Sequence, residues 1–191
     1  EMPGAEHAVS AWDLLAGAAP LAGDVVVHDG TGRHPAPQIA ALAGTRGSAV
    51  LLTSIDSHLA AELTYAERVI WKRELYDLDI PARFDRRLIG IGKSGNRLVA
   101  RFANEVNGAV EEVETDQVAV EFGAMPADDL YRALHGASRN DGVTDPDALV
   151  AGLPQPAAGR EGFELHRIGD AVASRNIPAA ILDAFRLMHI I

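Results

Sequence analysis

The sequence predicts an α/β fold, in which a Rossmann-like parallel sheet has flanking helices and an inserted antiparallel β-meander. Two short apolar runs, at 24–29 and 49–54, are uninterrupted, as expected of strands buried on both faces of a parallel sheet. Helical stretches follow both runs, and this alternation implies right-handed crossovers between parallel strands. Residues 87–116 instead predict two or three exposed antiparallel strands, with turns at KSGN and NEVNGA.

The other elements follow in chain order. Ser10 is a suitable N-cap for the first helix, Asn176 is one for the last, and Pro178 fits the first turn of that last helix. Helices are expected over 8–17, 36–44 and 63–78, after Met125, and over 176–191. Further strands are expected over 117–123 and 163–170, and the Gly-, Pro- and Asp-rich stretch 136–162 predicts a long loop.

These elements suggest four parts of the chain. A connecting segment (1–19) precedes an α/β domain (20–126), whose meander covers about 84–116. A helix and long loop (127–162) lead to a C-terminal strand–helix pair (163–191).

Composition excludes several classes of function. The 191 residues include 17 basic and 27 acidic ones, and the net charge of −10 argues against nucleic acid or an anionic membrane as partner. The absence of cysteine excludes disulfides and thiolate metal sites within this chain, and the histidine spacings match no metal motif. We expect a cytoplasmic protein, and the first residues read as part of a longer polypeptide.

The sequence HDGTGRHP, between the first strand and its helix, is the main candidate for nucleotide binding. Gly30 permits a tight turn, and Gly32 lets the backbone approach a pyrophosphate at a helix N-terminus. Arg33 and His34 stand at the mouth, within reach of an anion. Pro35 occupies the third position of the glycine fingerprint, where it removes one phosphate donor. A plain strand-to-helix turn with exposed polar residues is the alternative interpretation.

The end of the second strand is where a dinucleotide ribose would bind. A carboxylate there favours NAD and nearby arginines favour NADP. The chain instead has Thr53 and Ser54, which can hydrogen-bond a ribose without selecting between the two, and Asp56 comes two residues late.

A second candidate lies near the C-terminus, where Gly169 and Asp170 follow the last predicted strand. A carboxylate between a strand end and a helix can accept a hydrogen bond from a ligand hydroxyl, such as that of a flavin ribityl chain. Its alternative role is that of a helix cap or turn residue. Gly123, which ends the strand before the Met-Pro turn, completes the set of candidate cofactor-binding residues.

Several segments together resemble one family. PGAEHAVSAWDLL, DGTGRHPA, VAVEFGAMPADDLYRAL and RIGDAVASRNIPAAILDAFRL are similar to the C-terminal region of the NADH:flavin oxidoreductases built on an old-yellow-enzyme barrel. That family includes 2,4-dienoyl-CoA reductase, trimethylamine and histamine dehydrogenases and N-methylproline demethylase-like enzymes. The resemblance covers essentially the whole chain and is strongest to the demethylase-like branch in RIGDAVASRN.

The resemblance implies an incomplete glutathione-reductase-like module. In such enzymes an N-terminal barrel carries FMN, a cysteine cluster holds a 4Fe–4S centre, and the C-terminal part binds FAD with NAD(P)H, or ADP alone. Residues 20–126 would then be the inserted pyridine-nucleotide-like domain, and Gly169–Asp170 would meet the FAD ribityl chain. The barrel, in the same polypeptide or a partner subunit, would be the principal partner, and this fragment alone is not expected to be an active enzyme.

The sequence predicts the C-terminal nucleotide-binding domain of a flavin-dependent oxidoreductase, which would place a nicotinamide near FAD for hydride transfer. The alternative is a non-catalytic structural or docking domain with a vestigial or ADP-only site, and Pro35 and the missing ribose carboxylate support this alternative. The substrate and the choice among NAD, NADP and ADP are not encoded in these residues, because substrate contacts would lie in the barrel.

Overall fold

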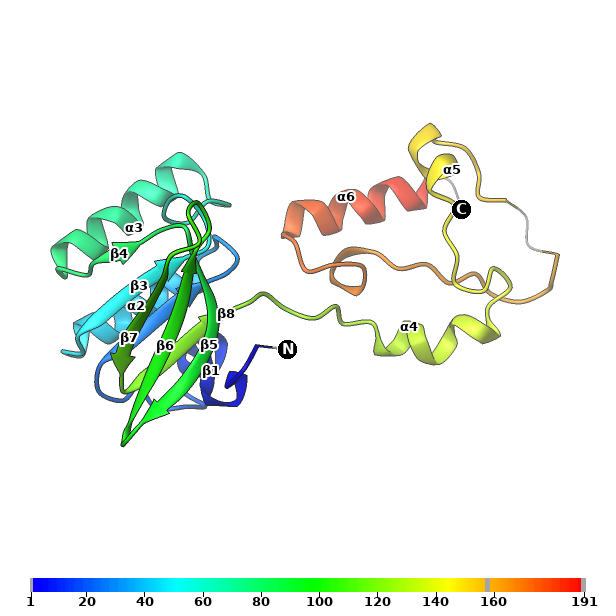
Figure 1. Cartoon of the computed structure of the whole chain (residues 1–191). Helices are drawn as coiled ribbons and strands as arrows, with labels where there is room; N and C mark the ends of the chain where they lie inside the picture. The colour runs from blue at the N-terminus through cyan, green and yellow to red at the C-terminus, as the bar shows by residue number, and fades with distance from the viewer. Residues whose placement is uncertain (1, 157–158, 190–191) are drawn as a thin grey trace. The chain divides into compact units, whose positions relative to one another are not determined.

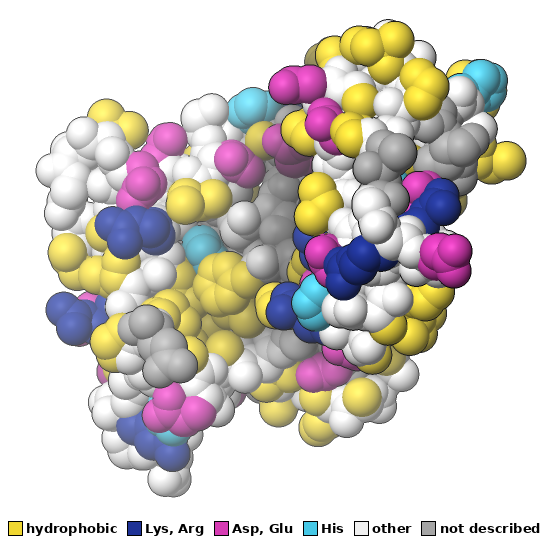
Figure 2. All heavy atoms as spheres, turned by 90° about the vertical axis from the view of Figure 1, so that its right-hand side faces the viewer, with side chains coloured by type: hydrophobic (Ala, Val, Ile, Leu, Met, Phe, Trp, Pro, Cys, Tyr) yellow, Lys and Arg dark blue, Asp and Glu magenta, His cyan; other side chains and the backbone are white. Residues whose placement is uncertain are grey.

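The computed structural model describes residues 2–156 and 159–189. The chain divides into two compact units, Glu1–Phe122 and Gly123–Ile191, and each unit is described by itself (Figure 1). On the face drawn in Figure 2, hydrophobic side chains are intermixed with acidic and basic ones. None of the described helices has the length and apolar character needed to span a membrane. The same residues contain no cluster of His, Asp or Glu suited to a metal ion.

A parallel sheet of five strands forms the centre of the N-terminal unit, in the order β1-β8-β2-β3-β4. The strands are β1 (Ala8–Ser10), β2 (Val25–Asp29), β3 (Val50–Ser54), β4 (Ala82–Arg83) and β8 (Gln117–Glu121). Val27 of the central strand β2 pairs with Leu52 on one side and Ala119 on the other. Three helices, α1 (Ala11–Leu15), α2 (Pro35–Thr45) and α3 (Tyr65–Asp77), complete the strand–helix alternation.

The predicted meander forms a second, antiparallel sheet. Its strands are β5 (Arg86–Ser94), β6 (Arg97–Asn104) and β7 (Val110–Thr115). Gly95, with a φ of +60°, lies in the tight turn between β5 and β6, where its missing side chain permits that conformation. The predicted fold class, a parallel sheet with flanking helices and an inserted meander, is confirmed.

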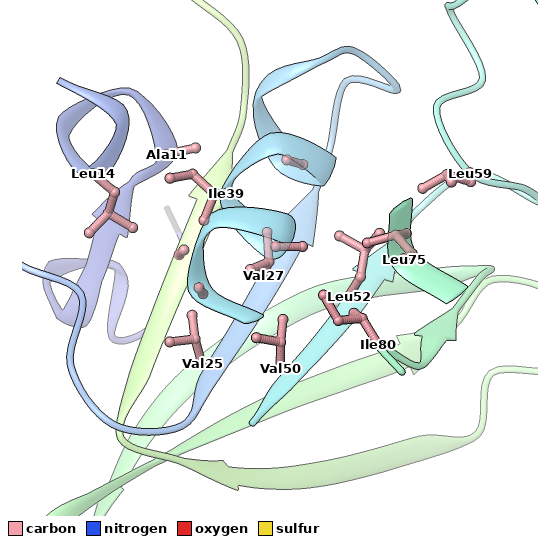
Figure 3. Packing of buried hydrophobic residues seen from close by; sticks show 14 of the residues in the cluster. Ala11, Leu14, Val25, Val27, Ile39, Val50, Leu52, Leu59, Leu75 and Ile80 are labelled. Carbon is pink, nitrogen blue, oxygen red and sulfur yellow. The ribbon is translucent and has the colours of Figure 1, made fainter. Parts of the chain in front are cut away.

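Alternation along β2 creates two cores, one on each face of the parallel sheet. Val25 and Val27 pack with Ile39 of α2 and with Leu52, on the helix face (Figure 3). Val26 points the other way and packs with Phe102 of β6, on the meander face. Because side chains of a strand point to opposite faces in turn, the unbroken apolar run of β2 is buried on both sides.

The C-terminal unit has short helices and little regular structure between them. Its elements are α4 (Asp129–Leu134), the 3₁₀ turns η2 (His135–Ala137) and η3 (Gly169–Ala171), α5 (Pro146–Ala151) and α6 (Ile177–Met188). Asn176 caps α6 as expected, because its side chain accepts the N–H of Ala179 at 2.9 Å.

Three details differ from the sequence expectations. Residues 8–17 form a strand before the helix, because Ala8–Ser10 pair in parallel with Val118–Val120, so the expected connection at 1–19 contributes to the sheet. The loop at 136–162 contains α5. The strand expected over 163–170 is absent: Glu164 and Leu165 are held by Arg139 and Asn140, with no strand partner in the part of this unit that is described.

Candidate functional site

The glycine turn lies at the carboxyl edge of the parallel sheet, where nucleotides bind in doubly wound folds. It connects Asp29, the last residue of β2, to Pro35, the first of α2. In a working dinucleotide turn, free backbone N–H groups and the helix N-terminus face a pyrophosphate. A pyrophosphate can bind in this way only where the N–H groups of the turn are not already hydrogen-bonded within the protein.

The carboxylate of Asp29 already accepts the N–H groups of this turn. Its Oδ1 atom lies 3.0 Å from the backbone nitrogen of Thr31 and 2.8 Å from that of Gly32. The Asp29 side chain is fully buried. The two donors best placed for a phosphate oxygen thus bind a carboxylate oxygen of the same chain, in an Asx-type turn.

The N-terminus of α2 offers few further donors. Pro35 and Pro37 stand at the first and third helical positions, and neither has an N–H group. Only Ala36 retains an N–H among the first three residues, and the next nitrogen, of Gln38, donates to the carbonyl of His34 at 3.0 Å. The helix dipole is present, but few of the free N–H donors that normally accompany it in an anion site remain.

Both glycines of the turn are in close contact with protein. A Cβ on Gly32 would lie 2.8 Å from Asp56 Oδ2 and 3.0 Å from two backbone nitrogens of the loop after β3, those of Ala61 and Glu62. A Cβ on Gly30 would lie 2.8 Å from the ring of Phe122. The φ of Gly32 is +66°, which also favours glycine. The chain therefore needs both glycines for its own packing, without reference to a pyrophosphate.

The surroundings of the turn are acidic. Burial raises the pKa of Asp29 above its ordinary range, the N–H groups of Thr31 and Gly32 counteract this, and the carboxylates of Asp56 and Glu121 raise the pKa again. Asp29 Oδ2 is buried and has no hydrogen-bond partner among the described residues. A phosphate placed here would have three acidic side chains as neighbours, and such surroundings disfavour an anion.

The side chain of His34, at the mouth of the glycine turn, contacts α3. Its Nδ1 accepts the indole N–H of Trp71 at 3.0 Å, so Nε2 carries the proton and faces Glu67 Oε1 at 3.5 Å. Arg33, half-buried beside it, also interacts within the protein.

Thr53 and Ser54, the residues predicted to face a ribose, are fully buried at the end of β3. The Thr53 hydroxyl donates to the carbonyl of Val27 at 3.2 Å and therefore accepts from Nδ1 of His28, 3.0 Å away. Ser54 Oγ accepts the N–H of Asp56 at 3.1 Å. Both hydroxyl groups are thus hydrogen-bonded within the protein at this edge of the sheet.

The other predicted residues lie in the C-terminal unit. Gly169 has a φ of +56°, and its N–H donates to Asp183 Oδ2 of α6 at 3.1 Å. The carbonyl of Asp170 accepts the N–H of Ala127 at 3.1 Å, whereas its carboxylate is exposed. Gly123 is the first residue of this unit and also has a positive φ, of 88°. The predicted site residues therefore divide between the two units, six in the first and these three in the second.

The residues that sequence reasoning missed are Asp29 and Pro37. Asp29 precedes the first glycine directly, and an Asx turn two or three residues on was readable from Asp-Gly-Thr-Gly. Pro37 was equally visible once the helix start was placed at Pro35. Each removes donors that a phosphate needs.

No family model matches the chain. Among curated proteins it is 42% identical to the multifunctional alkene reductase/demethylase OYE of Caballeronia cordobensis, over 97% of this chain and 28% of that protein. It is 40% identical to the probable N-methylproline demethylase of Rhizobium meliloti strain 1021, again over 97% of this chain and 28% of the relative. The chain thus spans less than a third of the length of either relative.

Solved structures agree in fold. The 6-hydroxypseudooxynicotine amine oxidase of Pseudomonas geniculata N1 superposes with a TM-score of 0.74 and 21% identity. The match covers 99% of this chain and 25% of that protein. Histamine dehydrogenase from Rhizobium sp. 4-9 superposes with a TM-score of 0.71 and 19% identity. The match covers 97% of this chain and 27% of that protein. These relatives are flavin-dependent oxidoreductases and dehydrogenases. The chain is therefore similar to a part of these curated relatives, an alkene reductase/demethylase of the old yellow enzyme type and a probable N-methylproline demethylase, which is the resemblance that its sequence motifs predicted.

Proposed function

We propose that this chain is the C-terminal module of a longer flavin-dependent oxidoreductase, and that its glycine turn closes on the protein itself instead of binding a dinucleotide. The similarity to about 28% of each of two curated relatives supports the first part. The second part favours the alternative of the sequence analysis, a structural module with a nucleotide-binding fold, over the predicted placement of a nicotinamide.

One observation carries this choice: the Asp29 carboxylate accepts the N–H groups of Thr31 and Gly32, which a pyrophosphate would need. The two prolines of α2 and the close contacts of both glycines act in the same direction. Redox chemistry in the longer polypeptide then belongs to cofactors held outside the glycine turn, since cofactors carry the electron transfer and the protein positions them.

The C-terminal unit supports a second, finer proposal about flavin. Asp170 has an exposed carboxylate within the 3₁₀ turn η3, and its carbonyl is bound by the N–H of Ala127 while the N–H of its neighbour Gly169 is bound by Asp183. A carboxylate held in this way can accept a hydroxyl of an FAD ribityl chain, as the family resemblance suggests. The remaining FAD contacts would come from the rest of the longer polypeptide.

Calorimetric titration with NADH, NADPH and ADP tests the closed turn. We expect no binding of any of the three at millimolar ligand by the purified chain. Two variants test the role of Asp29. Asp29→Gly removes the internal acceptor and should free the N–H groups of the turn for a nucleotide, whereas Asp29→Asn removes the charge but keeps an acceptor oxygen and should leave the turn closed. Binding by the unaltered chain, with amide shifts at Thr31 and Gly32 in NMR spectra, would contradict the proposal.

The Asp170 proposal needs the longer polypeptide, in which flavin content is the measurement. Asp170→Ala should lower the FAD bound per protein, whereas Asp147→Ala, an exposed acid of α5, should leave it unchanged. Equal FAD content in both variants would show that Asp170 is only a turn residue.

A further inference from the structure

A cavity of about 400 Å³ opens between α3 and the edge strand β4, on a different part of the N-terminal unit from the glycine turn. Its floor consists of the core side chains Leu59, Leu75 and Ile80, which are less than 9% exposed and lie together in Figure 3. This volume lies within the range of small-molecule sites, which are mostly apolar with a few placed polar groups.

Asp79 at the rim of this cavity is an unfavourable residue for its position. The N–H of Asp79 bonds the carbonyl of Tyr76 at 3.2 Å, and the N–H of Ile80 bonds that of Leu75 at 2.9 Å. These two bonds form a Schellman motif at the end of α3, with Asp79 at the left-handed position and a φ of +52°. Glycine suits that conformation better, and a carboxylate opposes the negative end of the helix dipole. Such a conflict with local rules points to a role outside folding.

Lys72 also lies at this rim and carries the opposite charge to Asp79. It lies seven residues before Asp79, two helical turns away, and both line the cavity. Within the described chain, neither Lys72 nor Asp79 forms an ion pair, although the adjacent Arg73 pairs with Asp77 at 3.6 Å. An uncompensated ammonium and an uncompensated carboxylate therefore flank one apolar cavity.

Aromatic rings complete the lining. Tyr76 is 72% exposed at the rim, and Phe84, which directly follows β4, is half-buried in the wall. Ring faces attract both apolar groups and organic cations. Tyr76 and Asp79 lie three residues apart at the end of α3 and both line the cavity, so an ammonium group is best placed on this side of the opening.

We propose that this cavity binds a zwitterionic α-amino acid with a large apolar or aromatic side chain. The side chain covers the floor of Leu59, Leu75 and Ile80, the carboxylate faces Lys72, and the ammonium faces Asp79. A ligand with one charge leaves the opposite rim group without a partner. The proposal is independent of whether the glycine turn binds a nucleotide.

Three related compounds test the charge pattern by calorimetry on the 191-residue chain. L-Phenylalanine carries both charges, phenethylamine lacks the carboxylate, and 3-phenylpropionate lacks the ammonium. We expect L-phenylalanine to bind at least about tenfold more tightly than either analogue, since a charge-assisted hydrogen bond accounts for about that factor. NMR shifts on binding should be confined to 59–84. Equal affinity for all three, or no binding at 10 mM, would overturn the proposal.

Two variants assign the two charges. Lys72→Met should abolish the preference for L-phenylalanine over phenethylamine, and Asp79→Asn, which tolerates the same backbone, should abolish the preference over 3-phenylpropionate. Ala82→Leu fills the cavity and should abolish binding of all three compounds. Arg73→Met is the matched control on α3 and should bind as the unaltered chain does; an equal loss in Arg73→Met would sink the assignment.

Discussion

The two units of this chain differ in what holds them together. In the N-terminal unit, β2 is buried on both faces and separates two apolar cores. In the C-terminal unit, Leu187 is the one described hydrophobic residue that is buried, while α6 exposes Ile177, Phe185 and Met188. Its order rests instead on caps and on polar bonds, such as those of Asn140 to Leu165.

This contrast bears on stability because burial of apolar surface is the dominant favourable contribution to folding. We expect the N-terminal unit to unfold cooperatively and the C-terminal unit to open at a much lower free energy. If the chain is part of a longer polypeptide, as proposed, we expect the exposed apolar side of α6 to pack on another surface there. Four measurements sharpen or break this comparison.

The largest expected effect is at Phe102, which is fully buried between the sheets. Phe102→Ala should cost the N-terminal unit about 3–5 kcal/mol of unfolding free energy, since it leaves a large cavity. Phe185→Ala in α6, where the ring is 60% exposed, is the matched control and should change it by less than about 0.5 kcal/mol. Urea titration followed by tryptophan fluorescence reports on both; equal losses would remove the distinction between the units.

Acid should act on the N-terminal unit through His28. Burial lowers the pKa of His28 from 6.5 to about 4. The unfolded chain takes up a proton below pH 6.5 and the folded one does not, so stability falls as the pH drops from 6.5 to 4, by up to about 3 kcal/mol. His28→Gln should flatten this part of the pH profile. An unchanged slope in the variant would assign the acid sensitivity to other groups.

Matched helix caps compare the units directly. Thr64 caps α3 in a capping box with Glu67, and Asn176 caps α6. Each change to alanine should cost about 1 kcal/mol. Thr64→Ala should appear in global unfolding, whereas Asn176→Ala should appear only in amide exchange of α6. Appearance of both in global unfolding would mean that the two units unfold as one.

The smallest expected effect is a gain. Asp79→Gly relieves both the left-handed backbone and the charge at the end of α3, and should stabilise the N-terminal unit by about 0.5 kcal/mol. Thermal unfolding monitored by circular dichroism measures it. A loss of stability would show that the Asp79 side chain has a structural partner.

Regular elements with a strong local signal were predictable. The runs ending at Asp29 and Ser54 became strands within a residue of the expected bounds, and the meander appeared with its two turns. Ala8–Ser10 was not predictable, because three residues become a strand only by pairing with β8. The segment 163–170 alternates like a strand, yet no neighbouring strand in the described unit pairs with it.

The sequence by itself determined the α/β fold and the resemblance to the old yellow enzyme-like oxidoreductases, because apolar period, turn residues and motif order are local properties of the chain. It also placed Gly30 and Gly32 at the strand–helix junction. Only the tertiary structure decided what the N–H groups of that junction bind. Whether its N–H groups remain free depends on the direction of the Asp29 carboxylate and on the loop packed against Gly32, and such contacts form only when the elements assemble.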